Sequence, residues 1–484
     1  MSLHGSFARL TVHQPARRVY NKSQSVSTIL RDNAFPIERW YNPRDTFGEQ
    51  CVMGNPTAST ASPTSTTFEP PAPRSIEDTG LHLLFLADLA LKILYNVGSL
   101  TGLQVADRMK LPFNSCVDQV LEHLKREQLV EVKGSGGFGE QAYQYNIASK
   151  GREKAQEALE RSQYAGPAPV PLPVYVKAMQ KQSLKSFRVT QQAMRDALKH
   201  MVLNQQVMSQ IGPAVNSGRS IFLYGPPGDG KTTIAEAVGR MILTTDLLVP
   251  YAVEVDGTII KVFDESNHQP AQKQTSTMKN RDPRWISIQR PVIIVGGELT
   301  LETLDLVWDE VHKYYEAPYQ MKANGGMFLI DDFGRQQVRP RDLLNRWIVP
   351  LEKRVDYLTL HTGRKIEIPF DVLIVFSTNL APRDLVDEAF LRRIRHKIEI
   401  GDPNFEEYNE IFKRVAAAKK MDYDERALGY LIQEYYIKAR RRLRAVHPRD
   451  LIEQMVDIAA YLNVPKVVTK ELIDQACAAY FVDL

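Results

Sequence analysis

The stretch from Gly225 to Thr233 combines the residue types that bind a nucleotide phosphate chain. It reads Gly-Pro-Pro-Gly-Asp-Gly-Lys-Thr-Thr, which matches the spacing GxxxxGK[ST], and it follows an apolar segment typical of a buried strand. Glycines let backbone N–H groups turn toward phosphate oxygens, and a helix that begins at the lysine adds the positive end of its dipole. The motif therefore predicts binding of ATP or GTP. The residues expected around the phosphates are Gly225, Pro226, Pro227, Gly228, Asp229, Gly230, Lys231, Thr232 and Thr233.

Three residues of this loop have roles that their chemistry predicts. Lys231 is expected to reach the β- and γ-phosphates, and the Thr232 hydroxyl is expected to hold Mg²⁺. Asp229 stands within the loop, where its negative charge would repel phosphate unless its side chain points outward.

Two acidic residues follow a second apolar segment. Met327–Ile330 has the composition of a buried strand, and Asp331 and Asp332 come directly after it. This pattern is typical of a Walker B motif, in which the first acid holds Mg²⁺ and the second polarises the attacking water. A strand followed by two acids is by itself most often a solvated strand end. In one sheet with a phosphate-binding loop, it indicates nucleotide hydrolysis.

A third apolar segment ends in a polar tip. Residues 372–376 read Val-Leu-Ile-Val-Phe, and Ser-Thr-Asn follows. Asn379 at such a strand end could hydrogen-bond the γ-phosphate or the attacking water, although on its own it would be read as a turn residue.

Taken in this order, the motifs resemble those of the AAA+ ATPases over about residues 175–484. The resemblance implies that Asn379 is the sensor 1 residue. It implies an arginine finger, a cation that enters the nucleotide site of a neighbouring subunit, at Arg392 or Arg393. The segment His-Pro-Arg-Asp-Leu resembles the sensor 2 motif, with Arg449 as the sensor. Because the finger acts in trans, the resemblance also implies a ring, typically a hexamer.

One further feature narrows the resemblance. Residues 356–370 have the alternation of two strands around His361 to Gly363, just before the sensor 1 strand. This resembles the pre-sensor-1 hairpin of the MoxR-like ATPases, whose rings typically act as chaperones on partner proteins. The chain departs from the family at Asp332, where a glutamate is usual, and this leaves slow hydrolysis or a nucleotide-gated switch open.

The motifs require a sheet that positions them. From Arg219 to about residue 400, apolar segments alternate with helical patterns, which predicts a parallel α/β sheet with helices on both faces. We expect helices at 189–211 and 301–316, the second flanked by aromatic residues that either pack on the sheet or face a ring pore. The segment 256–291 is too long for an ordinary connection between a strand and a helix in such a core. Residues 405–484 have helical patterns throughout, as expected for a helical lid.

The region before this core has the element order of a winged helix-turn-helix. Residues 80–162 contain three helical patterns, a hairpin with a glycine-rich tip and a closing helix. Such a domain reads DNA or docks a protein. The sequence from Gly102 to Glu140 contains five basic and six acidic residues. A surface with such balanced charge supplies little affinity for DNA phosphates. We therefore favour protein docking. The basic run Lys438–Arg444, expected on a lid helix, keeps DNA binding open.

These patterns predict five consecutive parts. Residues 1–79 are expected to form a disordered tail rich in Pro, Ser and Thr, followed by the winged helix at 80–162. Residues 163–178 read as a stiff proline-rich linker. The AAA+ core is expected at 179–402 and the helical lid at 403–484.

The composition sets outer limits on function. Hydrophobic residues make up 43% of the 484 residues and charged residues 24%, with a net charge of +4; this excludes wholesale disorder and does not by itself indicate a nucleic-acid partner. Cys51, Cys116 and Cys477 are dispersed, which excludes a disulfide scaffold and favours a cytoplasmic location. No apolar run reaches the roughly 20 residues of a membrane span. The basic, acid-free residues 1–31 fit either a disordered tail or a transit peptide.

The motifs therefore predict an ATPase that binds ATP and Mg²⁺, and the resemblance implies that it assembles with itself into a ring and remodels a partner protein. Two alternatives stay open. One is a DNA-associated regulator that uses the winged helix, and the other is a nucleotide switch with little turnover.

Overall fold

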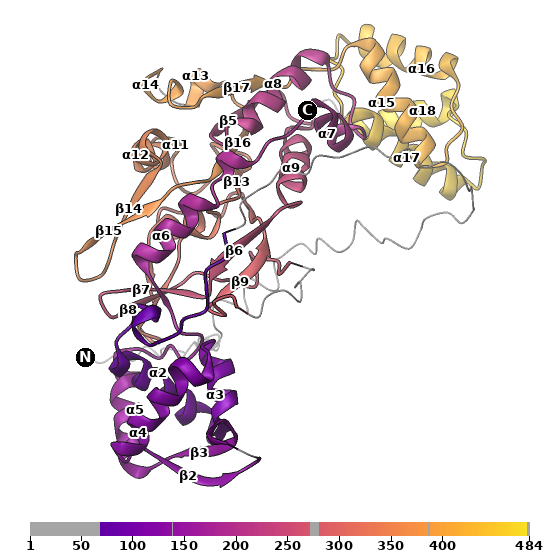
Figure 1. Cartoon of the computed structure of the whole chain (residues 1–484). Coiled ribbons are helices and arrows are strands. Elements are labelled where there is room, and N and C mark those ends of the chain that lie inside the picture. The colour runs from indigo at the N-terminus through magenta and orange to yellow at the C-terminus, as the bar shows by residue number, and fades with distance from the viewer. Residues whose placement is uncertain (1–67, 138, 272–279, 386–387, 482–484) are drawn as a thin grey trace, which may run out of the picture. The chain divides into compact units, whose positions relative to one another are not determined.

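The structure, a computed structural model, describes residues 68–137, 139–271, 280–385 and 388–481. Its centre is a five-stranded parallel sheet (Figure 1). The strands, in their order across the sheet, are β10 (Val292–Val295), β13 (Met327–Ile330), β16 (Leu373–Thr378), β5 (Ser220–Tyr224) and β17 (His396–Glu399). All four pairings are parallel. The prediction of a parallel α/β core is confirmed.

Helices cover both faces of this sheet. On one face, α7 (Gln191–Leu198), α8 (Gln205–Asn216) and α9 (Lys231–Ile242) bury apolar residues together with Ile221 and Leu223 of β5. On the other face, Phe222 belongs to a second apolar cluster with residues of α11 (Pro340–Arg346) and α12 (Ile348–Lys353). Burial on both sides explains why these strands are continuous apolar runs.

The helix expected at 189–211 is instead two helices. α7 ends at Leu198, and α8 begins after Asn204, whose side chain accepts a hydrogen bond from the N–H of Val207 (2.7 Å). Asparagine is a strong N-cap residue, because its side chain satisfies an N–H group that has no partner within the helix. It therefore starts a new helix where the apolar spacing alone indicated continuation.

A second sheet lies within the same part of the chain. Its strands, in spatial order, are β11 (Val307–Trp308), β12 (Tyr315–Glu316), β8 (Thr258–Lys261), β7 (Ala252–Val255) and β4 (Val170–Pro171). The helix expected at 301–316 is therefore wrong. Only Glu302–Leu304 forms a helical turn, and the Asp309 carboxylate accepts hydrogen bonds from the N–H groups of Val311 and His312 (both 2.8 Å), which turns the chain back. Pairing of β12 with β8 outweighs the local helical spacing.

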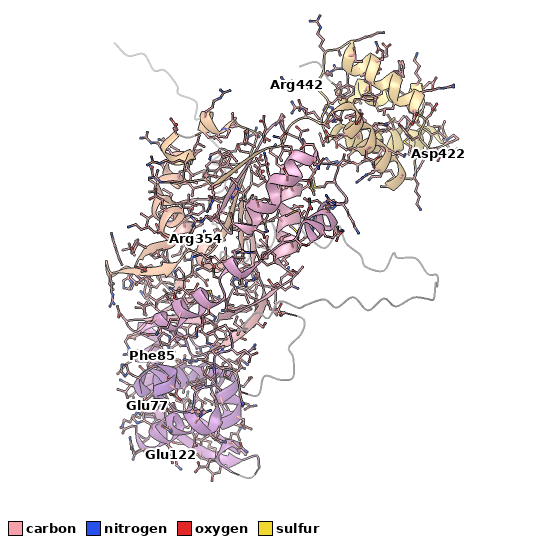
Figure 2. The ribbon with its side chains drawn as sticks, turned by 45° about the horizontal axis from the view of Figure 1, so that its top comes forward. Glu77, Phe85, Glu122, Arg354, Asp422 and Arg442 are labelled. Atoms are coloured by element: carbon pink, nitrogen blue, oxygen red, sulfur yellow. The ribbon has the colours of Figure 1, made fainter. Side chains whose placement is uncertain are left out.

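Two antiparallel pairs complete this region. β6 (Asp246–Pro250) pairs with β9 (Trp285–Gln289), so the described part of the long segment 256–291 includes the strands β8 and β9. β14 (Val355–Thr359) pairs with β15 (Lys365–Pro369) and forms the predicted hairpin before β16. Arg354, labelled in Figure 2, attaches the start of this hairpin to the core, because its guanidinium donates to Gly218 O (2.9 Å) and to Asp371 Oδ1 (3.0 Å).

The segment 163–178, expected to be a stiff linker, is part of the packed structure. Val170 is fully buried and pairs with β7, and α6 (Leu172–Lys181) follows immediately. A proline in the first turn suits the start of a helix, because the missing N–H group would have had no partner there. The prolines therefore begin a helix here, and α6 buries Tyr175 and Met179 against the second sheet.

The helices and hairpin expected between residues 80 and 162 are present. They are α2 (Leu83–Val97), β1 (Leu100–Thr101), α3 (Gly102–Met109), a π-helical turn (Phe113–Val117), α4 (Asp118–Arg126), β2 (Val130–Ser135), β3 (Tyr143–Ile147) and α5 (Ser149–Arg161). The three strands form an antiparallel sheet in the order β1-β3-β2. They share one apolar core with α2, α3 and α4.

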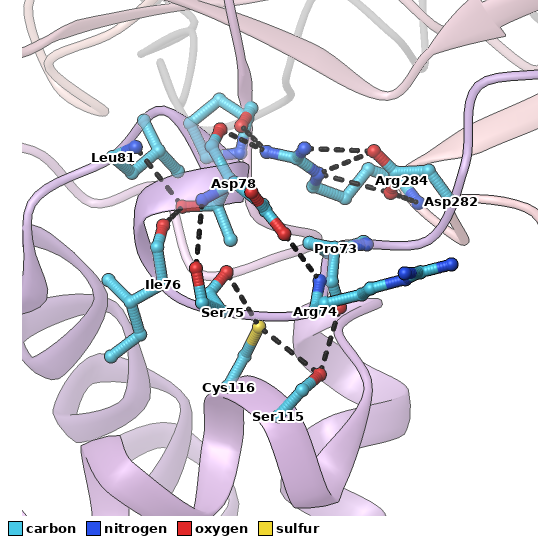
Figure 3. A network of polar contacts seen from close by, with 12 residues as sticks. Pro73, Arg74, Ser75, Ile76, Asp78, Leu81, Ser115, Cys116, Asp282 and Arg284 are labelled. Carbon is cyan, nitrogen blue, oxygen red and sulfur yellow. Dashed lines mark hydrogen bonds and ion pairs between the residues drawn. The ribbon is translucent and has the colours of Figure 1, made fainter.

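Part of the expected disordered tail is ordered. Residues 1–67, including Cys51 and the basic segment 1–31, lie outside the described residues. From residue 68 onward the chain is packed: Phe68 contacts Trp285 edge-to-face (5.6 Å between ring centroids) and Thr79 is buried. Figure 3 shows the polar contacts that hold this segment, in which Arg284 donates to Thr79 O (2.9 Å) and Ser115 donates to Pro73 O (2.9 Å). The disorder prediction is therefore wrong for residues 68–79.

The C-terminal region is helical, as predicted. It consists of α15 (Phe405–Ala418), α16 (Glu425–Leu431), a π-helical segment (Ile432–Ile437), α17 (His447–Leu462) and α18 (Lys470–Tyr480), which share one apolar core. The basic run Lys438–Arg444 does not lie on a regular helix. It occupies the connection between the π-helical segment and α17. Among the described residues, no helix is both long enough and apolar enough to cross a membrane.

Candidate active site

The phosphate-binding loop connects β5 to α9. β5 ends at Tyr224, and α9 begins at Lys231 after Gly230. Gly230 has a φ of 84°, a left-handed conformation that residues with a Cβ rarely adopt. The loop therefore opens onto the N-terminus of α9, where free N–H groups and the helix dipole favour an anion.

Lys231 is held inside the loop. Its Nζ atom donates to Gly225 O (2.9 Å) and Pro226 O (2.6 Å), and the side chain is largely buried. Burial lowers the pKa of this ammonium, while the carboxylates of Asp229, Asp331 and Asp332 oppose that shift. The loop carbonyls thus keep a positive charge where phosphate oxygens are expected.

The two expected magnesium ligands lie together. The Thr232 hydroxyl, in the first turn of α9, is 3.0 Å from each carboxylate oxygen of Asp331, at the end of β13. Gln336 donates to Asp331 O (2.7 Å) and supports this strand end. A hydroxyl and a carboxylate suit Mg²⁺, which usually takes few protein ligands and completes its shell with water and phosphate oxygens. The described residues contain no cluster of three or more His, Cys, Asp or Glu side chains for a metal.

The expected catalytic base, Asp332, and the expected sensor 1 residue, Asn379, also lie close together. Asn379 Nδ2 is 3.4 Å from Asp332 Oδ1, and Asp332 is exposed. β16 lies between β5 and β13, so its tip falls between the phosphate loop and the acidic pair. The Thr378 hydroxyl donates to Phe333 O (2.6 Å), which joins the two strand ends. The arrangement places an acid and an amide where a water molecule could be positioned.

The three expected arginines have different surroundings. Arg393 pairs with Glu352 of α12 (Nε to Oε1, 2.6 Å), whereas Arg392 is exposed. Arg449, in the first turn of α17, pairs with its neighbour Asp450 (3.0 Å), and its side chain is 60% exposed. These contacts place Arg393 against α12 and Arg449 beside Asp450.

Another lid arginine, Arg444, reaches the loop. Its NH1 atom is 3.4 Å from Pro227 O and 3.6 Å from Asp229 Oδ2. Asp229 points toward the lid, because its Oδ1 atom accepts a hydrogen bond from the N–H of Ala445 (3.0 Å). Burial raises the pKa of Asp229 to about 6. Arg444 was missed as a site residue; the only signals in the sequence were an acid in the phosphate loop and a basic run in the lid.

Comparisons with known proteins cover parts of the chain. The chain is 23% identical over 227 residues to a Corynebacterium jeikeium protein named "AAA ATPase forming ring-shaped complexes", and the match covers 42% of each protein. The chain therefore spans less than half of this curated relative. Residues 404–479 match a family described as "Domain of unknown function (DUF8689)".

Solved structures give more distant matches. NtrX from Brucella abortus in complex with ATP matches over 58% of both chains, with 15% identity and a TM-score of 0.36. The RuvB Holliday junction branch migration motor of Thermotoga maritima matches over 58% of this chain and 71% of its own, with 14% identity and a TM-score of 0.34.

Proposed function

We propose that the chain is an AAA+ ATPase that binds ATP with Mg²⁺ and hydrolyses it. The observation that carries this proposal is the 3.0 Å contact of Thr232 with Asp331, which joins the phosphate loop to the acidic strand end. Similarity to the curated AAA ATPase supports it. The proposed site consists of Lys231, Thr232, Asp331, Asp332 and Asn379, together with the loop from Gly225 to Thr233.

The proposed reaction transfers the γ-phosphoryl group to water. Lys231 leaves the loop carbonyls and binds the β- and γ-phosphate oxygens. Asp332 orients the water and accepts its proton, while Asn379 holds the water in line. The bond from the water oxygen to the γ-phosphorus forms as the bond to the β,γ-bridging oxygen breaks, which yields ADP and phosphate. Bound Mg²⁺, held by Thr232 and Asp331, would neutralise charge on the phosphate oxygens.

Comparing Lys231→Ala with the wild type tests the activity. We expect magnesium-dependent phosphate release to disappear in the variant, because the fixed positive charge is lost. Lys185→Ala, which removes an exposed lysine outside the site, is the matched control and should behave as the wild type. Equal rates for Lys231→Ala and the wild type would contradict the proposal.

We infer that the active form is a ring, by resemblance a hexamer, in which Arg392 enters the neighbour's site. The exposure of Arg392 supports a role in trans. The name of the curated relative refers to ring-shaped complexes, which agrees with this proposal. Light scattering with and without ATP measures the assembly, and a chain that stays monomeric with ATP would contradict it.

For the target, we propose a partner protein that the ring remodels, as in MoxR-like ATPases. The β14–β15 hairpin directly before β16 supports that relationship. We further propose that residues 80–162 are a winged-helix domain that recruits the partner, and that the core and lid are divided near residue 402. The exposed surface of α4 carries both acidic and basic side chains, such as Glu122, Lys125 and Arg126. This mixed charge favours a protein over DNA as the partner.

DNA binding is the second candidate, since the helices and the three-stranded sheet have the order of a DNA-reading domain. Duplex DNA should be titrated with the full chain across a salt series, because phosphate contacts make affinity fall steeply with salt. Lys125→Glu/Arg126→Glu would weaken binding through α4, and Arg440→Glu/Arg442→Glu would weaken binding through the lid run. Absence of binding at low salt would leave protein recruitment as the better account.

A further inference from the structure

Three consecutive residues of the phosphate loop contact three consecutive residues of the lid. Pro227 O accepts a hydrogen bond from Arg444 (3.4 Å), and Asp229 accepts one from the N–H of Ala445 (3.0 Å). Between them, Gly228 packs so closely that a Cβ atom there would lie 2.6 Å from Val446 Cγ1. Glycine is therefore required for this approach of the lid to the loop. The lid is attached to the residues that would surround the phosphates.

The Asp229 side chain is the most buried part of this contact. It is 1% exposed, and its second oxygen, Oδ2, lies 3.6 Å from NH1 of Arg444. Arg444 also lies 3.5 Å from Asp402, in the connection between β17 and the lid. Arg442, labelled in Figure 2, lies 3.7 Å from the other oxygen of Asp402. Two carboxylates and two guanidinium groups thus join the phosphate loop, the end of the sheet and the lid.

An acid in a phosphate loop would weaken anion binding if it faced the phosphates. Here the carboxylate accepts a hydrogen bond from the N–H of Ala445, in the segment that precedes α17. Lys231 is bound to the loop carbonyls Gly225 O and Pro226 O and must leave them to reach phosphate. When Lys231 exchanges the loop carbonyls for phosphate oxygens, the loop moves, and Asp229, two residues before Lys231, moves with it.

We propose that Asp229 is a positioning residue that ties the lid to the phosphate loop, so that nucleotide binding in the loop changes the position of α17. The proposal rests on nucleotide binding by this loop. The hydrogen bond to Ala445 fixes the backbone before α17, and the ion pair with Arg444 adds a contact with the side chain. Removal of the Asp229 carboxylate leaves Lys231, Thr232 and Asp331 in place and removes two contacts between the loop and the lid, the hydrogen bond from Ala445 and the ion pair with Arg444.

Hydrogen exchange of the full chain with and without Mg-ATP at pH 7.5 tests this connection. In the wild type, ATP should slow exchange in peptides of the loop (225–233) and of the lid (440–462). In Asp229→Ala, the loop should still respond and the lid response should be lost. Asp229→Asn, which retains an acceptor for Ala445, should give an intermediate response. Glu236→Ala, an exposed acid on α9, is the matched control and should respond as the wild type.

Arg444→Gln tests the same connection from the lid and leaves the loop sequence intact. It should also reduce the lid response while the loop response remains. Steady-state kinetics should then show a fall in kcat of about tenfold or more in Asp229→Ala with a smaller change in KM, since a charged hydrogen bond is lost outside the phosphate contacts.

Each other outcome has a definite meaning. A lid response in Asp229→Ala equal to that of the wild type overturns the proposal. So does a loss of both responses in Asp229→Ala combined with wild-type behaviour of Arg444→Gln, because Asp229 would then support only the loop. If the wild-type loop shows no response to ATP, nucleotide binding itself is wrong.

Discussion

The Thr232 hydroxyl lies 3.0 Å from both carboxylate oxygens of Asp331, although the two residues are 99 positions apart in the chain. One begins α9 and the other ends β13, and β16 lies between the strands that lead to them. This contact brings a hydroxyl and a carboxylate to the mouth of the phosphate loop, and three of the five predictions below concern residues around it.

The first prediction concerns magnesium. Asp331→Asn removes the negative charge from the proposed ligand pair and should raise the Mg²⁺ concentration for half-maximal ATP hydrolysis by at least about tenfold. Thr232→Ala should act in the same direction, whereas Thr232→Ser keeps the hydroxyl and serves as the control. A magnesium titration of phosphate release measures this. An unchanged midpoint in Asp331→Asn would exclude Asp331 as a ligand.

The second prediction concerns the catalytic base. Asp332→Asn keeps the shape of the side chain and the left-handed backbone (φ 48°) but loses the charge. ATP should still bind, and hydrolysis should slow by about 10²- to 10⁴-fold. Asp332→Glu should keep or raise activity, because the longer acid reaches further toward the water. Normal turnover by Asp332→Asn would assign the base to another group.

The third prediction separates the two candidate fingers. Arg393 pairs with Glu352 in its own chain, and Arg392 is exposed. Arg392→Ala should therefore lower the rate by roughly 10³- to 10⁵-fold, and Arg393→Ala should mainly lower stability. Mixing Arg392→Ala with Lys231→Ala protein should restore some activity, since intact sites form between the two. If no ratio of the two proteins restores turnover, the finger does not act in trans.

The fourth prediction concerns the segment 68–79. Arg284 and Asp282 form an ion pair in which each side chain is 4% exposed, and Arg284 also donates to Thr79 O and Pro169 O (Figure 3). Arg284→Ala leaves Asp282 buried without its partner and should lower the free energy of unfolding by about 3–5 kcal/mol. Lys154→Ala breaks the exposed pair with Glu157 and should cost less than about 1 kcal/mol. Urea denaturation compares them; similar costs would contradict the role assigned to Arg284.

The fifth prediction is a pH dependence of stability. Burial raises the pKa of Asp229 from 3.8 to about 6, against the opposing effects of the Ala445 N–H, Arg444 and Lys231 and with Asp402 adding to the rise. The folded state thus binds this proton more tightly than the unfolded state. The stability gained from this binding is present at low pH and is lost as the pH rises through about 6.

Wild type and Asp229→Asn should be unfolded with urea at pH 5 and 7.5. Relative to the variant, the wild type should be about 1.4 kcal/mol more stable at pH 5 than at pH 7.5. Effects of the other titrating groups are shared by the two proteins and cancel in this difference. A difference that does not change with pH would mean that Asp229 does not titrate in this range.

Much of the site could be predicted because its signals are local. The spacing of the glycines predicts the shape of the loop from Gly225 to Thr233. The acidic pair and Asn379 each follow an apolar run that is typical of a buried strand. The structure brings these segments together at one edge of the sheet. The hairpin before β16 was equally readable, since its two strands alternate between buried and exposed residues over a short range.

Three of the failed predictions concern segments whose structure depends on distant partners. The helical spacing at 301–316 was overridden by pairing of β12 with β8, more than 50 residues earlier. The prolines of 163–178 fitted a linker equally well until Val170 paired with β7. Residues 68–79 have few apolar side chains of their own. They are ordered because Phe68 packs against Trp285 and Thr79 O accepts a hydrogen bond from Arg284.

The sequence by itself determined the phosphate loop, the acidic strand end and the parallel α/β core, because each depends on residue types at short, regular spacing. Only the tertiary structure decided that Asp229 faces the lid and that Arg444, rather than Arg449, reaches the loop. Asp229 and Ala445 are 216 positions apart. Their contact depends on how the lid helices pack and where α17 begins, and no local pattern around either residue encodes that distance.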